Sequence, residues 1–126
     1  MSSSDLAKLE DNGFEIAAHT HHHKVLPRLS FDQQKISIER NLDFLKGLLG
    51  REKFTLSYPF GFHNDHTKRI MKELGVLAGF TLGRKLIKPQ DLQSRWSIPR
   101  YDVNDCFNKK NNTLKHEVFS TLSTGD

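Results

Sequence analysis

The chain has 126 residues and a formal net charge of +4, with 36% hydrophobic and 27% charged residues. This length suits one domain that buries a core, and the composition is too apolar for a disordered chain. No apolar run approaches the ~20 residues that a membrane-spanning helix needs. A single cysteine, Cys106, excludes an internal disulfide framework and a thiolate zinc cluster.

The charge distribution argues against nucleic acid as a partner. Basic residues are spread along the chain, and the densest group is Arg84, Lys85 and Lys88. Because no aromatic residues are interleaved with them, we interpret this group as a solvated loop, which could still attract an anionic glycan. The N-terminus lacks the basic and apolar regions of a signal peptide, so we expect a cytoplasmic chain, or a cell-envelope protein if an N-terminal part is missing.

The first elements are a helix and a strand. Residues 5–12 are predicted to form the last turns of a helix, which Gly13 ends. Residues 14–18 are then predicted to form a short strand, which runs directly into the histidine-rich residues 19–23.

A longer helix and a second strand follow. Ser30 and Gln33 have the spacing of a capping box, and apolar residues continue at helical spacing to a stop at Gly50. Residues 54–58 are predicted to form a strand that ends at Pro59.

The remaining elements are less regular. A third helix is predicted over residues 65–74 and a third strand over 76–82. We expect a polar loop over residues 83–95, an extended segment over 96–103 and a last helix over 113–122.

Strands that alternate with helices predict an α/β fold with a parallel sheet or barrel. In such folds the chemistry gathers at the carboxyl ends of the strands. Two unusual motifs lie there, namely the histidine cluster after the first strand and Tyr58-Pro59-Phe60-Gly61 at the end of the second. This coincidence predicts a functional site.

The histidine cluster is the candidate metal site. Four of the seven histidines lie within residues 19–23, and neutral imidazole binds Zn²⁺ and similar divalent ions. We expect a tight turn to bring His19 and His23 together as ligands, while His21 and His22 either point elsewhere or support the two ligands from behind. The alternative is a solvated histidine-rich loop.

A catalytic zinc usually needs a third protein ligand. The candidates here are His63, Asp65 and His66, which follow the second strand. The alternative, which we favour, is a helix N-terminus capped by Asn64 or Asp65.

Two further residues have candidate roles. The Tyr58-Pro59-Phe60-Gly61 turn is suited to aim backbone N–H groups at a developing oxyanion, although a plain strand-ending turn is the alternative. Arg100 follows another extended segment and is a candidate to orient a carboxylate or contact a substrate, against the commoner case of a surface arginine.

Taken together, these segments resemble the polysaccharide deacetylase family, the NodB-homology domain. The resemblance covers roughly residues 5–105 and is most specific in the pairing of His-Thr-x-x-His with the later Tyr-Pro-Phe-Gly. It runs in order through Asn12-Gly13-Phe14-Glu15-Ile16-Ala17-Ala18-His19-Thr20, His23, Ser57-Tyr58-Pro59-Phe60-Gly61, Glu73-Leu74-Gly75-Val76, Ala78-Gly79-Phe80-Thr81 and Ile98-Pro99-Arg100-Tyr101-Asp102-Val103.

The resemblance implies a metal-dependent enzyme that removes N- or O-acetyl groups from carbohydrates. His19 and His23 would bind the metal, Zn²⁺ or alternatively Co²⁺, Ni²⁺ or Mn²⁺, beside an aspartate. Tyr58 would offer its backbone N–H to the tetrahedral oxyanion, and Arg100 would orient the catalytic carboxylate. The implied fold is a partial (β/α) barrel of this family, formed by residues 1–126 as a single domain that lacks its first strand or strands.

The sequence departs from the family at its first motif. The family's Asp-Asp strand end, which supplies the catalytic base and the third metal ligand, belongs before the helix at 5–12 and is not in this sequence. We therefore expect either the C-terminal portion of a deacetylase or an inactive metal- or glycan-binding remnant. A homodimer that covers exposed sheet edges is a further expectation. Leu114-Lys115-His116 matches the family's last motif only by chance, because no apolar strand precedes it.

Overall fold

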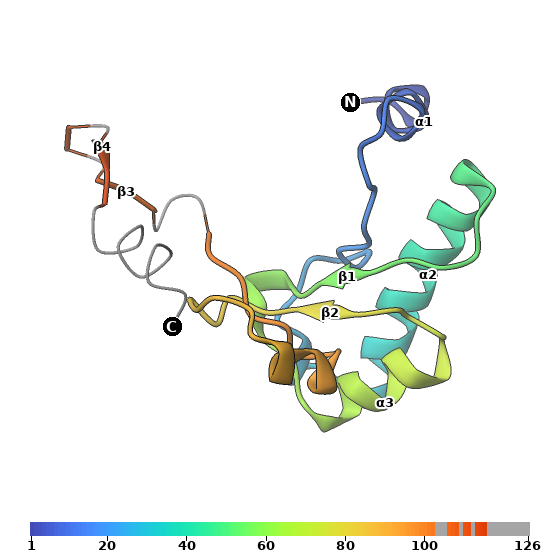
Figure 1. Cartoon of the computed structure of the whole chain (residues 1–126). Helices are drawn as coiled ribbons and strands as arrows, with labels where there is room; N and C mark the ends of the chain where they lie inside the picture. Colours follow the sequence, from blue (N-terminus) through green and yellow to red (C-terminus); the bar gives the residue numbers. More distant parts are fainter. Residues whose placement is uncertain (103–105, 109, 112, 116–126) are drawn as a thin grey trace.

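The structure is a computed structural model that describes residues 1–102, 106–108, 110–111 and 113–115 (Figure 1). Its helices and strands, in chain order, are α1 (Ser3–Asp11), the 3₁₀ turn η1 (Leu26–Arg28), α2 (Phe31–Leu49), β1 (Leu56–Ser57), η2 (Pro59–Gly61), α3 (Asp65–Glu73), β2 (Gly79–Phe80), η3 (Pro89–Ser94), β3 (Phe107–Asn108) and β4 (Thr113–Leu114).

Four chain segments lie side by side as a parallel sheet. β1 pairs with β2, with Leu56 opposite Gly79 and Ser57 opposite Phe80. Single parallel bridges extend this pair on both sides, from Ala18 to Leu56 and from Phe80 to Ile98. The predicted parallel sheet of an α/β fold is therefore confirmed.

The long helix α2 begins and ends where the sequence predicts. The Ser30 side chain accepts from the Gln33 N–H, the Gln33 side chain accepts from the Ser30 N–H, and Gly50 takes the left-handed conformation with φ of 66°. Its buried apolar residues, which include Ile38, Leu42 and Leu45, face the core.

The third helix is also capped locally. Asn64 caps α3, because its side chain accepts from the Thr67 N–H while the Thr67 side chain accepts from the Asn64 N–H. This confirms the interpretation of residues 63–66 as a helix N-terminus. α3 packs against α2, and both lie beside the β1–β2 pair (Figure 1).

The core forms where α2 and α3 meet the sheet segments. Its fully or almost fully buried apolar residues are Ala18, Leu26, Ile38, Leu42, Leu45, Phe54, Leu56, Tyr58, Ile70, Met71 and Val76. By contrast, α1 buries none of its residues and stands away from the β1–β2 pair (Figure 1). Within the described part of the chain, no helix is long and apolar enough to span a membrane.

The strands are shorter than predicted. Of residues 14–18 only Ala18 forms a bridge, because the Ile16 carbonyl accepts instead from the Arg51 guanidinium at 2.7 Å. Pro59 has no N–H and begins a 3₁₀ turn, which limits β1 to two residues. Residues 83–95, predicted as a loop, contain the 3₁₀ helix η3.

The helix predicted from residue 113 is wrong at its start. Thr113–Leu114 forms β4, which pairs antiparallel with β3. The Asn111 side chain fixes the turn before β4, since its Oδ1 accepts from the N–H and the hydroxyl of Thr113 at 3.3 and 2.6 Å. Residues 116–122 of the predicted helix, and with them His116, lie outside the described residues.

Candidate functional site

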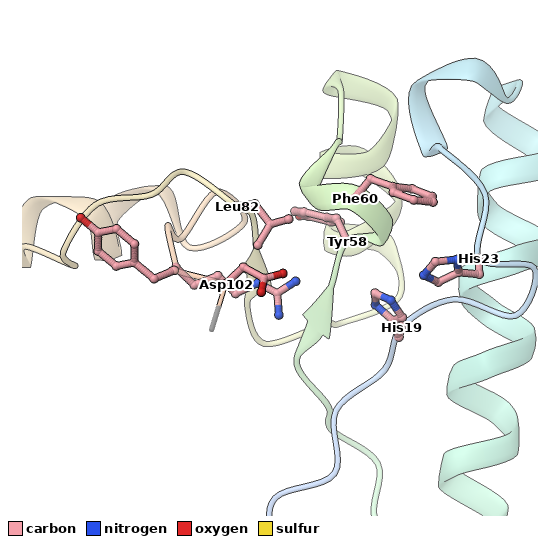
Figure 2. Close-up of a pocket in the computed structure, with 8 residues that line it drawn as sticks. His19, His23, Tyr58, Phe60, Leu82 and Asp102 are labelled. Atoms are coloured by element: carbon pink, nitrogen blue, oxygen red, sulfur yellow. The ribbon is translucent and has the colours of Figure 1, made fainter. Parts of the chain in front are cut away.

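A cavity of about 440 Å³ lies at the carboxyl ends of the parallel segments (Figure 2). Each segment contributes to it through residues that directly follow it in the chain. The lining residues are His19 and His23 after the Ala18 bridge, Tyr58 and Phe60 after β1, Leu82 after β2, and Arg100, Tyr101 and Asp102 after Ile98. The predicted gathering of functional groups at the strand ends is therefore what the fold produces.

The predicted tight turn brings His19 and His23 together. Their ring centroids are 4.8 Å apart, and both rings project into the cavity (Figure 2). The turn uses two left-handed residues that are not glycine, Thr20 with φ of 64° and His23 with φ of 50°. The Thr20 hydroxyl accepts from the His23 N–H at 3.2 Å, which offsets part of the cost of this conformation.

A hydrogen bond fixes the tautomer of His19. Its Nδ1 lies 2.7 Å from the Ser57 carbonyl oxygen in β1. Because a carbonyl oxygen can only accept, Nδ1 carries the proton, and the neutral ring then keeps its lone pair on Nε2. Metal-ligating histidines generally make such a bond through their other ring nitrogen.

Helix α2 holds the histidine loop through hydrogen bonds to its backbone. The Asn41 side-chain oxygen accepts from the His19 N–H at 2.9 Å. One turn earlier, the Ser37 carbonyl accepts from the His21 N–H at 2.9 Å, and the Ser37 hydroxyl accepts from the His22 N–H at 3.2 Å. Neither α2 residue was predicted from the sequence, although a serine on a buried helical stripe is a signal that points to Ser37.

His21 and His22 do not line the cavity. Their rings meet edge to face with centroids 4.7 Å apart. The His22 Nδ1 instead lies 3.2 Å from the Ser37 hydroxyl.

The Tyr58 amide is not available in the way that the sequence predicts. Its N–H donates to the Phe80 carbonyl at 3.0 Å as part of the β1–β2 ladder. The Tyr58 side chain is fully buried and donates its hydroxyl to the Trp96 carbonyl at 2.6 Å, and burial raises the pKa of the phenol well above its ordinary value. Tyr58 borders the cavity, but its amide could reach an oxyanion only by giving up a sheet hydrogen bond.

The neighbouring Phe60 is placed differently. It has φ of 58°, and its ring is 54% exposed and lies 5.1 Å from the His23 ring between centroids (Figure 2). Among the described residues, no hydrogen-bond acceptor is found for the Phe60 N–H. From the sequence, Phe60 was predicted only as part of the turn and not as a separate site residue.

Arg100 is anchored in the cavity wall. Its Nε donates to the Thr81 carbonyl at 3.0 Å, and its Nη1 donates to the Ser57 hydroxyl at 3.1 Å. These bonds use two of its five N–H donors and hold the side chain half-buried, which distinguishes it from a freely solvated surface arginine. Asp102, which was not predicted as a site residue from the sequence, supplies a carboxylate to the same cavity (Figure 2).

The candidate third ligands do not join His19 and His23. His63 Nε2 lies 2.9 Å from the Ser97 hydroxyl, and its ring stacks on Tyr58 with centroids 4.8 Å apart. The His66 ring packs against Phe31, and Asp65 is the first residue of α3. None of the three lines the cavity.

The donor set present fits a metal only in part. His19 and His23 offer two imidazole nitrogens, whereas a catalytic zinc usually has three protein ligands. Over the residues whose placement is described, no group of three or more histidine, cysteine, aspartate or glutamate side chains is arranged to hold an ion. A third ligand would have to come from outside that set.

A sequence model of the polysaccharide deacetylase family matches residues 2–79. The chain belongs to the polysaccharide deacetylase family. The matched residues include His19 and His23, the Tyr-Pro-Phe-Gly turn and helices α1, α2 and α3, so the resemblance predicted from the motifs is confirmed.

One characterised relative is similar to most of the chain. The chain is 29% identical over 117 residues to the poly-beta-1,6-N-acetyl-D-glucosamine N-deacetylase of Staphylococcus epidermidis, covering 85% of this chain and 40% of that protein.

Two solved structures share the fold. The Streptococcus pyogenes deacetylase PplD, in complex with acetate, matches with a TM-score of 0.75 and 23% identity over 80% of this chain and 44% of that one. IcaB from Ammonifex degensii matches with a TM-score of 0.69 and 18% identity over 98% and 52%. The chain therefore spans about half the length of these relatives or less.

Proposed function

We propose that this chain carries part of the active site of a metal-dependent carbohydrate deacetylase, which hydrolyses acetyl groups on a polymer of N-acetylglucosamine. The observation that carries the proposal is the His19–His23 pair at a strand end, with Nε2 of His19 left as a lone-pair donor. Membership of the family supports the reaction, and the name of the S. epidermidis relative supports the substrate class.

In this proposal His19 and His23 are the two ligands that the chain contributes to a divalent ion, Zn²⁺ or alternatively Co²⁺, Ni²⁺ or Mn²⁺. Such an ion supplies Lewis-acid polarisation of an acetyl carbonyl and lowers the pKa of water. The Ser57 carbonyl keeps the His19 proton on Nδ1. The Asn41 side chain on α2 holds the histidine loop beside the cavity, through its bond to the His19 N–H.

The other cavity residues act on the acetyl group and the catalytic carboxylate. We assign the oxyanion-donor role to the Phe60 N–H, in place of the Tyr58 N–H, because the latter is bonded within the sheet. Arg100 orients a neighbouring carboxylate through a charge-assisted hydrogen bond. Asp102 is the candidate for that carboxylate within this chain.

The test combines calorimetry with an acetate-release assay on β-1,6-linked N-acetylglucosamine oligosaccharides in added Zn²⁺ or Co²⁺. We expect His19→Ala and His23→Ala each to weaken Zn²⁺ binding by at least about tenfold, since each removes one protein ligand. His21→Ala is the matched control, because His21 lies in the same loop but outside the cavity. A chain that neither binds metal nor releases acetate would refute the proposal.

A second candidate is a metal- or glycan-binding domain without turnover. The missing third ligand within the described part of the chain favours it. Zn²⁺ binding that depends on His19 and His23, with no acetate release, would support this candidate over the enzyme.

We also propose that residues 1–126 form a single domain whose parallel segments are part of a (β/α) barrel. The open order of the segments, Ala18, β1, β2 and Ile98, supports an incomplete ring. The homodimer that would cover exposed edges stays a prediction.

A further inference from the structure

The outer face of α2 carries exposed apolar side chains that the core does not use. Ile36 and Phe44 are each 51% exposed, on the side of the helix opposite the buried Ile38, Leu42 and Leu45. Neither Ile36 nor Phe44 lines the candidate-site cavity. Large apolar side chains that share one exposed helix face are typical of a contact with another protein surface.

The exposed residues of this face form a line at the spacing of a helix–helix contact. They follow one another by four, three and four positions, which keeps them on one line about 16 Å long. In chain order, these residues are Ile36, Arg40, Asp43 and Gly47. Phe44 lies beside the line, one helical turn after Arg40. We call the five residues the α2 outer stripe.

Gly47 leaves a gap in the α2 outer stripe. It lies inside α2, where glycine is less stable than alanine. Its φ is not positive, and a Cβ built on it meets no atom within 4 Å, so no contact within the described part of the chain requires a glycine here. The gap has room for a bulky side chain from a second helix.

The two charges of the α2 outer stripe make the stripe complementary to itself. Neither Arg40 nor Asp43 takes part in an ion pair or a side-chain hydrogen bond with another described residue. An antiparallel second copy would place its Asp43 opposite Arg40 and its Gly47 opposite Ile36. A parallel second copy would place like charges opposite each other, so the charges select the antiparallel arrangement.

We propose that two copies of this chain associate through the α2 outer stripe, with the two helices antiparallel about a two-fold axis. Ile36 enters the gap at Gly47 of the partner subunit. Arg40 pairs with Asp43 of the partner subunit, and both contacts repeat in the other direction. Phe44 adds apolar area beside the charged pairs. This contact is separate from the exposed sheet edges and from the candidate-site cavity, whose lining includes none of the stripe residues.

Sedimentation equilibrium of the full chain tests the proposal by charge reversal. Arg40→Asp places two aspartates opposite each other at both pairs, and Asp43→Arg places two arginines there. Each variant alone should therefore dimerise at least about tenfold more weakly than the unmodified chain. An equimolar mixture of the two variants restores opposite charges at both pairs and should dimerise about as tightly as the unmodified chain. Arg28→Asp, at an exposed arginine of η1 outside the stripe, is the matched control and should leave dimerisation unchanged.

The outcomes separate this inference from the proposed function, on which it does not depend. A chain that stays monomeric up to about 1 mM overturns the inference. A dimer that neither reversal weakens, or that the mixture fails to restore, overturns it as well, because the contact then lies on another surface. His19→Ala should leave dimerisation unchanged. If the unmodified chain dimerises with the expected pattern but binds no Zn²⁺ and releases no acetate, the proposed function fails and the inference stands.

Discussion

At the scale of single residues, Gly79 is required for space and not for backbone freedom. It lies in β2, next to the Tyr58 hydroxyl, which donates to the Trp96 carbonyl at 2.6 Å. A Cβ at position 79 would overlap the Tyr58 hydroxyl and lie 3.0 Å from the Trp96 carbonyl oxygen. Since Tyr58 borders the candidate-site cavity, this small residue keeps a wall of the candidate site in place.

Gly79→Ala should therefore destabilise the protein by about 1–3 kcal/mol, because the phenol must move and loses a buried hydrogen bond. Urea unfolding followed by circular dichroism measures the change. Gly47→Ala is the control, since Gly47 lies within α2 with no atom within 4 Å of the added Cβ, and it should stabilise the protein by about 0.5–1 kcal/mol. Equal stability of the two variants would contradict the steric argument.

At the scale of elements, one face of α2 packs in the core and another face binds the histidine loop. Ile38, Leu42 and Leu45 face the core, whereas Ser37 and Asn41 bind the histidine loop. Because caps define both ends of α2, these two polar residues keep fixed positions along the helix axis, next to the histidine loop. α2 is therefore the element that sets the position of His19 relative to β1.

Asn41→Ala removes the acceptor for the His19 N–H and should weaken Zn²⁺ binding by about 10–100-fold, as expected for groups that orient metal ligands. Calorimetry with Zn²⁺ measures the effect. Asn41→Asp keeps an acceptor oxygen at the same place and should restore most of the affinity. If the alanine variant binds Zn²⁺ as tightly as the unmodified chain, α2 does not position the ligand.

At the scale of the whole molecule, the stacked rings of Tyr58 and His63 bring the segment before α3 against a residue of the candidate site. Tyr58 borders the candidate-site cavity, and the His63 ring stacks on it while its Nε2 lies 2.9 Å from the Ser97 hydroxyl. Burial lowers the pKa of His63 below its ordinary value of 6.5, and the nearby Lys68 lowers it further. The folded protein therefore holds this histidine neutral at pH values where the unfolded chain already protonates it.

The sign of the resulting pH dependence follows from proton uptake. Below about pH 6.5 the unfolded state binds more protons at His63 than the folded state, so the free energy of unfolding falls as the pH falls. Urea unfolding at pH 8 and pH 5.5 should show a smaller decrease for His63→Gln than for the unmodified chain. His66→Gln, in which the stacked pair is untouched, is the control and should keep the original decrease. An unchanged decrease in His63→Gln would contradict this assignment.

Much of the fold was predictable because its signals are local. The caps of α2 and α3 depend on residues three positions apart, Ser30 with Gln33 and Asn64 with Thr67, and glycine marks where α2 ends. The failures were also local in origin. The helix predicted from residue 113 did not account for the Asn111 side chain, which bonds Thr113 and turns the chain into a hairpin.

The sequence by itself determined the family, the parallel order of the strands and the histidine pair at a strand end, because each depends on residue types at short spacing. Only the tertiary structure decided which groups complete the site. The Asn41 and Ser57 bonds to His19 join residues 22 and 38 positions apart, and Asp102 reaches the cavity from the last sheet segment. Such contacts depend on how the elements pack against one another, and a pattern of neighbouring residues in the sequence does not specify that packing.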